Sequence, residues 1–189
     1  MKITPNSIEL DKELSNLDKF AIDFSKVIGK HTQYVIVSGY VSILLGRTRG
    51  SEDIDMLVPE MEENQWIKIY KILEKEGYYC LNIDAKESYS YLKDDIAVRF
   101  APKGQVIPNM EILFAKEKVQ KLALSTKIMA SVGKDKIFIS NLELQIAYKE
   151  KMLRSPKDVE DARHLRKLLG KTINMKKLKD YEGMLNEKR

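Results

Sequence analysis

One stretch, residues 34–58, constrains the fold more than any other part of the sequence. Its first segment, YVIV, is too short and too β-branched for a helix, so a buried strand is predicted there. The pair Ser38-Gly39 ends this strand and opens a short apolar helix over residues 40–45. A polar turn then leads to a second strand at 53–58. A strand, a helix and a strand in so few residues predict an α/β sheet.

Helices and strands alternate in the sequence on both sides of this stretch. An amphipathic helix is predicted over residues 7–28, with Asn6 or Ser7 as its cap, because apolar residues recur there at alternating spacings of three and four. These residues are Leu10, Leu14, Leu17, Ala21, Phe24 and Ile28. A second amphipathic helix, 61–76, should end at Gly77. A strand is predicted at 78–83.

The next segments predict a hairpin. Residues 96–101 and 110–115 are apolar and flank the turn-prone sequence PKGQVIPN, so two antiparallel strands are expected. The segment 88–95 favours neither a helix nor a strand. A helix is predicted over 116–132, and a short strand follows at 136–139.

The remainder of the chain reads as helical. Ser140 and Glu143 have the spacing of a capping box, which predicts a helix from there to about residue 153. Ser155-Pro156 has the pattern of an N-cap and first-turn proline, and Gly170 should end that helix. A last helix should follow Asn174. The predicted organisation is an N-terminal helix (1–33), an α/β core (34–115) and a mostly helical C-terminal part (116–189).

Composition limits the classes of function. The 189 residues contain 43% hydrophobic residues, enough to bury a core, and one cysteine and two histidines, too few for a disulfide or a zinc cluster. No apolar stretch reaches the length of a membrane span, and the N-terminus lacks a signal-peptide core, so a cytoplasmic protein is expected. The net charge of +5 fits an anionic ligand such as a nucleotide or RNA, although the basic residues at 171–189 are more typical of a solvated helix face.

Two carboxylates indicate the chemistry. Asp53 and Asp55 are two residues apart on a predicted strand, so their side chains should lie on one face of it. Like charges on one face repel, and burying them uncompensated would cost several kcal/mol. A cation is therefore expected beside them. Oxygen ligands without sulfur or imidazole favour Mg²⁺ or Mn²⁺. The alternative is a solvated acidic turn, which is common for a bare Asp-x-Asp pair.

The residues before this pair favour the metal site. Gly39 lies between a strand and a helix start, where backbone N–H groups can receive a phosphate. Arg49 and Ser51 come immediately before the carboxylates and could contact the same phosphates. Together these residues predict a site that holds a divalent metal and a triphosphate.

At these positions the sequence resembles the DNA polymerase beta-like nucleotidyltransferase superfamily. The motif of that superfamily is an apolar strand, Gly-Gly or Gly-Ser, a short helix, and Asp-x-Asp or Asp-x-Glu; here it reads YVIVSGY, SILLGRTRGSE and DID. The form Arg-x-Ser-x-Asp-x-Asp is similar to the minimal nucleotidyltransferases of bacteria and archaea, including the abortive-infection toxin type. The order Ser38-Gly39 departs from the usual order of the pair.

The resemblance implies a third carboxylate on a neighbouring strand, as metal ligand and base for the acceptor hydroxyl. Its match is Glu111 in NMEILF, with Asp94 and Asp95 as the fallback. A glutamate in a strand with one wet face is the ordinary alternative, although apolar residues flank Glu111 on both sides. Glutamate is also longer than the aspartate usual at this position.

The resemblance extends to LELQIAYKEKMLRSPKDVEDARHL in the C-terminal part. Lys149 matches a lysine that faces the nucleotide phosphates in the toxin-type proteins, although a surface lysine with a buried stem is an equally common arrangement. Lys157, Asp158 and Asp161 match a second cluster. A carboxylate at Asp158 would also stabilise a helix that begins after Ser155.

As a whole, the resemblance implies a small mixed β-sheet nucleotidyltransferase core with flanking helices and a C-terminal helical part. The implied activity moves a nucleoside monophosphate from an NTP, such as ATP, to a hydroxyl acceptor and releases pyrophosphate. The acceptor could be RNA such as tRNA, a protein or a small molecule. The alternative is an inactive nucleotide- or RNA-binding member, for example one component of a toxin–antitoxin pair.

Overall fold

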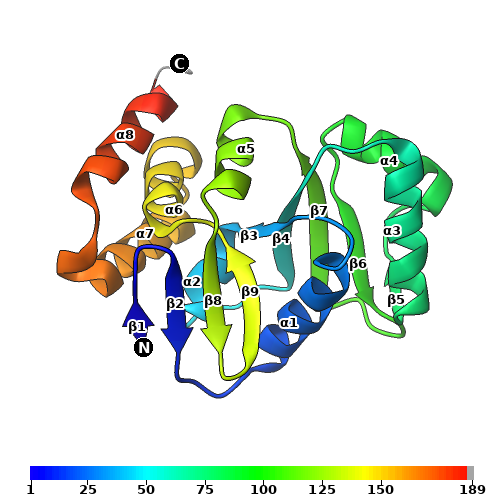
Figure 1. Ribbon diagram of the computed structural model, residues 1–189, viewed down its shortest axis with the longest axis horizontal. Coiled ribbons are helices and arrows are strands. Elements are labelled where there is room, and N and C mark those ends of the chain that lie inside the picture. Colours follow the sequence, from blue (N-terminus) through cyan, green and yellow to red (C-terminus); the bar gives the residue numbers. More distant parts are fainter. Residues whose placement is uncertain (187–189) are drawn as a thin grey trace.

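The computed structural model describes residues 1–186 as a mixed α/β fold built on one nine-stranded sheet, with strand order β1-β2-β8-β9-β3-β4-β7-β6-β5 (Figure 1). The strands are β1 (Lys2–Ile3), β2 (Ser7–Leu10), β3 (Val35–Val37), β4 (Asp53–Pro59), β5 (Tyr78–Cys80), β6 (Val98–Pro102), β7 (Asn109–Ala115), β8 (Ile128–Val132) and β9 (Asp135–Ile139).

The helices pack around this sheet: α1 (Asn16–Ile28), α2 (Ser38–Leu44), α3 (Glu63–Lys75), α4 (Ala85–Lys93), α5 (Lys118–Ser125), α6 (Leu142–Tyr148), α7 (Pro156–Leu169) and α8 (Met175–Asn186). A π-helical turn, Lys149–Leu153, continues α6, and a 3-10 turn, Gly170–Thr172, follows α7. In Figure 1, α6, α7 and α8 lie at the same end of the molecule as β1, whereas α3 and α4 lie at the opposite end. Among residues 1–186, no helix is long and apolar enough to span a bilayer.

The centre of the sheet confirms the strands predicted around residues 34–58 and 96–115. β3 runs antiparallel to β4, and β4 runs parallel to β7, so 110–115 lies beside 53–58 as expected. β6 and β7 form the predicted antiparallel pair. Ile54, Met56 and Val58 of β4 are almost fully buried, which places this strand in the core of the molecule.

The N-terminal prediction was wrong in part, because residues 7–10 form strand β2 and not the first turns of a helix. Ile8 and Leu10 are buried while Glu9 is exposed, which is the alternation of a strand with one covered face. β2 pairs in parallel with β8. The helix begins at Asn16, where Ser15 and Asp18 form a capping box.

The segment 116–132 was also predicted wrongly, since the helix ends at Ser125 and Ile128–Val132 forms strand β8. β8 and β9 form an antiparallel pair that carries the sheet into the C-terminal part, which is therefore not all helical. The segment 88–95, left open above, is mostly helix α4.

The observed starts of the last three α-helices agree more closely with the positions predicted from the sequence. The cap of α6 is Asn141, whose side chain accepts a hydrogen bond from the backbone N–H of Leu144, so the predicted Ser140 cap was one residue early. Ser155 caps α7 with Pro156 in its first turn, and the last helix follows Asn174, both as predicted.

Candidate active site

Asp53 and Asp55 lie on β4, at the end of the strand nearest the loop that precedes it. Both are partly buried, whereas Ile54 between them is fully buried on the other face. The hydroxyl of Ser51 donates to the backbone carbonyl of Asp53 at 3.0 Å and reaches its Oδ1 at 3.3 Å. Ser51 therefore fixes the backbone and one carboxylate oxygen at the start of the strand.

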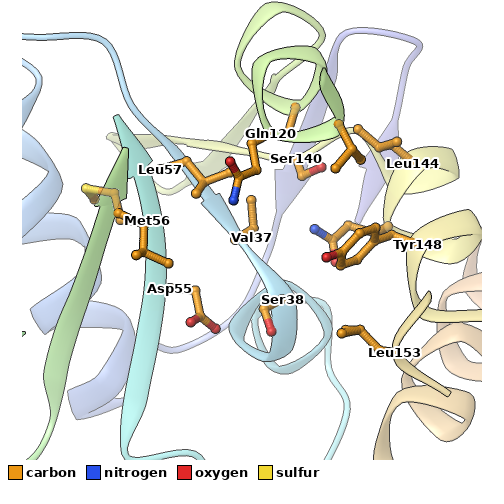
Figure 2. Close-up of a pocket in the computed structure, with 14 residues that line it drawn as sticks. Val37, Ser38, Asp55, Met56, Leu57, Gln120, Ser140, Leu144, Tyr148 and Leu153 are labelled. Atoms are coloured by element: carbon orange, nitrogen blue, oxygen red, sulfur yellow. The ribbon is translucent and has the colours of Figure 1, made fainter. Parts of the chain in front are cut away.

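Asp55 is the more perturbed of the two carboxylates. Burial, which is the largest cause, and the negative charges of Glu111 and Asp53 together raise its pKa to about 6, against the lowering effects of a hydrogen bond from Ser38 and the charge of Lys149. Figure 2 shows Asp55 and Ser38 on neighbouring elements, with their oxygens at the same end of a cavity. A desolvated carboxylate among like charges is an arrangement that a cation would stabilise.

Gly39 is required by the position of Arg49. The φ of Ser38, which precedes Gly39 at the start of α2, is 62°, in the left-handed region. A Cβ built at Gly39 would lie 1.8 Å from Nη2 of Arg49. The guanidinium therefore rests directly on the glycine, and no larger residue fits without displacing it.

Arg49 is held from its other side by a carboxylate of α7. Asp161, which is fully buried, lies 3.3 Å from both Nε and Nη2 of Arg49, and it also accepts a hydrogen bond from Nη1 of Arg47. One carboxylate thus binds the loop before β4 to the helical part of the chain.

Lys149 completes this buried cluster. Its side chain is fully buried, and Nζ donates to Asp161 at 2.9 Å and to Asp158 at 3.0 Å. The resemblance placed Lys149 toward nucleotide phosphates, but its hydrogen bonds go to α7. Its charge nevertheless reaches the site, since it lowers the pKa of Asp55. Asp158 also receives the hydroxyl of Ser155, so both interpretations of Asp158 describe part of its surroundings.

Glu111 lies directly beside Asp55 in the parallel pairing of β4 with β7. Its carboxylate forms an ion pair with Nε of Arg99 at 2.7 Å, and Arg99 lies opposite it on β6. The charge of Glu111 raises the pKa of Asp55, so the two carboxylates interact. Of the fallback candidates, Asp95 forms an ion pair with Lys116, and Asp94 caps the end of α4.

The donor set fits a divalent cation in part. Asp53 and Asp55 offer two carboxylates on one face, the hard oxygen ligands that Mg²⁺ and Mn²⁺ prefer. Within the described residues, no group of three or more acidic, histidine or cysteine side chains is arranged as a metal site. Glu111 is engaged by Arg99, so a third protein ligand would require that ion pair to open.

The apolar lining beside Asp55 was not apparent in the sequence. A cavity of about 180 Å³ opens there between β3, β4, α5 and α6 (Figure 2). Besides Ser38, Asp55 and Ser140, the cavity is lined by polar side chains from two helices, Gln120 of α5 and Gln145 and Tyr148 of α6. In the sequence they are ordinary residues of amphipathic helices, and no spacing marks them as members of one site.

Comparison with solved structures identifies the fold as that of nucleotidyltransferases. The chain is similar to an antigenic nucleotidyltransferase-like protein from Paracoccidioides brasiliensis, with a TM-score of 0.55 and 14% identity over 90% of this chain and 88% of that one. It is also similar to ANT(2″)-Ia, solved in complex with adenylyl-2″-tobramycin, with a TM-score of 0.51 and 14% identity over 90% of this chain and 96% of that one.

Neither a protein-family model nor a curated protein sequence matches this chain. At 14% identity the similarity establishes the fold alone, so any reaction must be inferred from the residues of the site.

Proposed function

We propose that this protein is a metal-dependent nucleotidyltransferase that moves a nucleoside monophosphate from an NTP to a hydroxyl acceptor and releases pyrophosphate. The observation that carries the proposal is the Asp53–Asp55 pair on one strand of a nucleotidyltransferase fold, next to the Ser38-Gly39 turn. Two partly buried carboxylates that repel each other are costly to retain unless a cation balances them.

Each residue of the site has a proposed role. Asp53 and Asp55 would hold Mg²⁺ or Mn²⁺, which when bound neutralises triphosphate charge and aligns the acceptor with the α-phosphorus. Ser38, Gly39 and Arg49 would bind the phosphates, and Ser51 would keep Asp53 in place.

Two further residues would act through charge. Glu111, if released by Arg99, would join Asp55 and accept the proton of the attacking hydroxyl. Lys149 would stabilise the negative charge of the site from within its buried cluster, because its charge already acts on Asp55.

One observation favours a second function, that of an inactive nucleotide- or RNA-binding protein on the same fold. The carboxylate of Glu111 is occupied by Arg99, so the third carboxylate that the resemblance implies is not free for catalysis. The toxin–antitoxin role implied by the resemblance belongs to this alternative, as a protein that binds a nucleotide or RNA without transfer. ANT(2″)-Ia, in contrast, suggests a small-molecule acceptor.

One experiment distinguishes the active nucleotidyltransferase from the inactive binding protein. The purified chain is incubated with each α-labelled NTP, ATP included, together with Mg²⁺ and total RNA or cell lysate, and the labelled product is identified by nuclease and protease digestion. We expect one NTP to label one acceptor class, and EDTA to abolish the labelling. NTP binding without any labelling would instead establish the second function.

Replacing Gly39 with alanine should weaken NTP binding by about tenfold. The new Cβ would occupy the position of Nη2 of Arg49, so the guanidinium must leave its place and its charge-assisted contacts with phosphate would be lost. The measurement is calorimetric titration with the NTP that the labelling experiment identifies.

Gly50→Ala is the matched control, because a Cβ at Gly50 meets nothing within 4 Å in the same loop. Its NTP affinity should stay within twofold of the unmodified protein. Equal affinities for the two variants would show that Arg49 does not contact the triphosphate.

A further inference from the structure

The cavity beside Asp55 is chemically unlike the charged site at its edge. Of its fourteen lining residues, Asp55 is the only one that carries a charge, and most of the others are apolar. Pockets for complete drug-sized ligands usually enclose about 300–1,000 Å³. A cavity of about 180 Å³ therefore suits a fragment the size of one ring system. A group with several positive charges would be desolvated there with a single carboxylate as partner.

Gln120 presents a hydrogen-bond donor to this cavity. Its Oε1 accepts the backbone N–H groups of Lys116 and Glu117, both at 2.9 Å, at the start of α5. Because these two partners can only donate, the amide cannot be turned round, and its NH₂ group is left on the other side. Figure 2 shows that nitrogen directed toward Val37, on the cavity side.

Gln145 supplies a second amide from α6. Its side chain is 5% exposed and lines the cavity, and it makes no side-chain hydrogen bond with another residue of 1–186. Its amide atoms are not among the fully buried, unpartnered side-chain atoms of residues 1–186, so they are accessible from the cavity that the residue lines. The Gln145 amide therefore offers a hydrogen-bond donor and an acceptor to a ligand in the cavity.

Tyr148 forms another wall of the cavity, one helical turn after Gln145 (Figure 2). Aromatic rings, apolar walls and a few fixed amides together are typical of sites for planar rings, which stack and read hydrogen bonds at their edge.

We propose that the cavity binds one uncharged planar ring with donors and acceptors on its edge, of the nucleobase type, and that Gln120 and Gln145 determine which ring is accepted. The ring belongs either to the NTP or to the acceptor. This inference rests on the proposed function, since it assigns a specificity pocket to the nucleotidyl-transfer site at Asp55.

The test measures how tightly the full chain binds three classes of probe in the presence of Mg²⁺. These are the four nucleosides, the four NTPs and inorganic tripolyphosphate. Gln145→Leu removes the amide and keeps most of its volume. Gln120→Glu keeps the oxygen that caps α5 and replaces the cavity-facing donor with an acceptor. Gln105→Leu, at an exposed position outside the cavity, is the matched control.

We expect Gln145→Leu to weaken binding of one nucleoside by about tenfold or more, as for a lost buried hydrogen bond. Gln120→Glu should change the order of preference among the four, and Gln105→Leu should change neither. Tripolyphosphate should bind Gln145→Leu, Gln105→Leu and the unmodified protein alike. Equal loss of nucleoside and tripolyphosphate binding in Gln145→Leu, or no loss at all, would overturn the inference.

The two sources of the ring are separated by repeating the nucleoside titration with a saturating non-hydrolysable NTP analogue. Competition assigns the cavity to the base of the NTP, whereas simultaneous binding assigns it to the acceptor. A protein that binds a nucleoside in a Gln145-dependent way but neither NTP nor tripolyphosphate would support the pocket and refute the proposed function. If the protein binds NTP equally well in both glutamine variants and binds no nucleoside, the pocket is refuted and the proposed function is supported.

Discussion

Asp55→Asn is expected to lower kcat for nucleotidyl transfer by about 10³-fold while the protein becomes more stable. The activity should fall because the proposed metal ligand loses its charge. The stability rises because burial and the charges of Glu111 and Asp53 oppose ionisation of Asp55, whose pKa is raised to about 6. The pKa of Asp55 in the folded state lies above the ordinary aspartate value of 3.8, so the cost of ionisation is complete above pH 6 and absent below about pH 4.

Initial rates are measured in Mg²⁺, and thermal unfolding is measured separately at pH 8 in EDTA. The gain in the free energy of unfolding should be about 1–3 kcal/mol. Asp11→Asn is the control, because it makes the same chemical change on an exposed residue and should alter neither rate nor stability. Loss of activity together with loss of stability in Asp55→Asn would mean that the residue supports the fold and not the reaction.

The sequence was sufficient for the strands and the turn that carry the candidate site, because the signals there are local. The strand YVIV, the Ser38-Gly39 turn and the two-residue spacing of the aspartates all lie within residues 34–58 and do not depend on distant partners. The neighbouring position of β7 followed from the hairpin pattern and from the need to bring Glu111 beside Asp55.

The sequence was insufficient where a segment satisfied two patterns at once. Ile8 and Leu10 belong equally to a helical stripe and to an alternating strand, and only the parallel pairing with β8 decides between them. That pairing joins segments about 120 residues apart, which no local pattern reveals. The orientation of Gln120 likewise depends on which backbone donors its oxygen meets.

The ion pair between Glu111 and Arg99 shows a further limit. Glu111 was identified from its position in an apolar strand, but its partner comes from the antiparallel register of β6 on β7. A sequence pattern can place a carboxylate in a site, whereas the competing cation beside it is a property of the assembled sheet.

The second large effect is expected for Asp161→Asn, which should destabilise the protein by about 3 kcal/mol or more. Asp161 is the shared partner of Arg47, Arg49 and Lys149, and both it and Lys149 are fully buried. Asparagine keeps the shape but leaves three cations with Asp158 as their one carboxylate in the cluster. Breaking a buried ion pair from one side typically costs about 3–5 kcal/mol.

For a chain of this size, that loss corresponds to a fall in Tm of roughly 6–12 °C. Glu160→Gln is the matched control, because Glu160 precedes Asp161 on α7 but pairs with Arg163 at an exposed position. Its effect should stay within about 0.5 kcal/mol. Equal stability of the two variants would show that the buried cluster does not hold the helical part to the site.

A second variant distinguishes an imbalance of charge from a loss of packing. Lys149→Met in the Asp161→Asn background removes one of the uncompensated cations and fills its volume with an apolar side chain of similar length. The double variant should therefore be less destabilised than the sum of the two single variants, with a coupling of about 1 kcal/mol or more. Strict additivity would contradict the cluster as an electrostatic unit. A coupling of that size would show that Lys149 and Asp161 act as one charged unit, and Asp161 is also the partner of Arg49, whose guanidinium lies against Gly39.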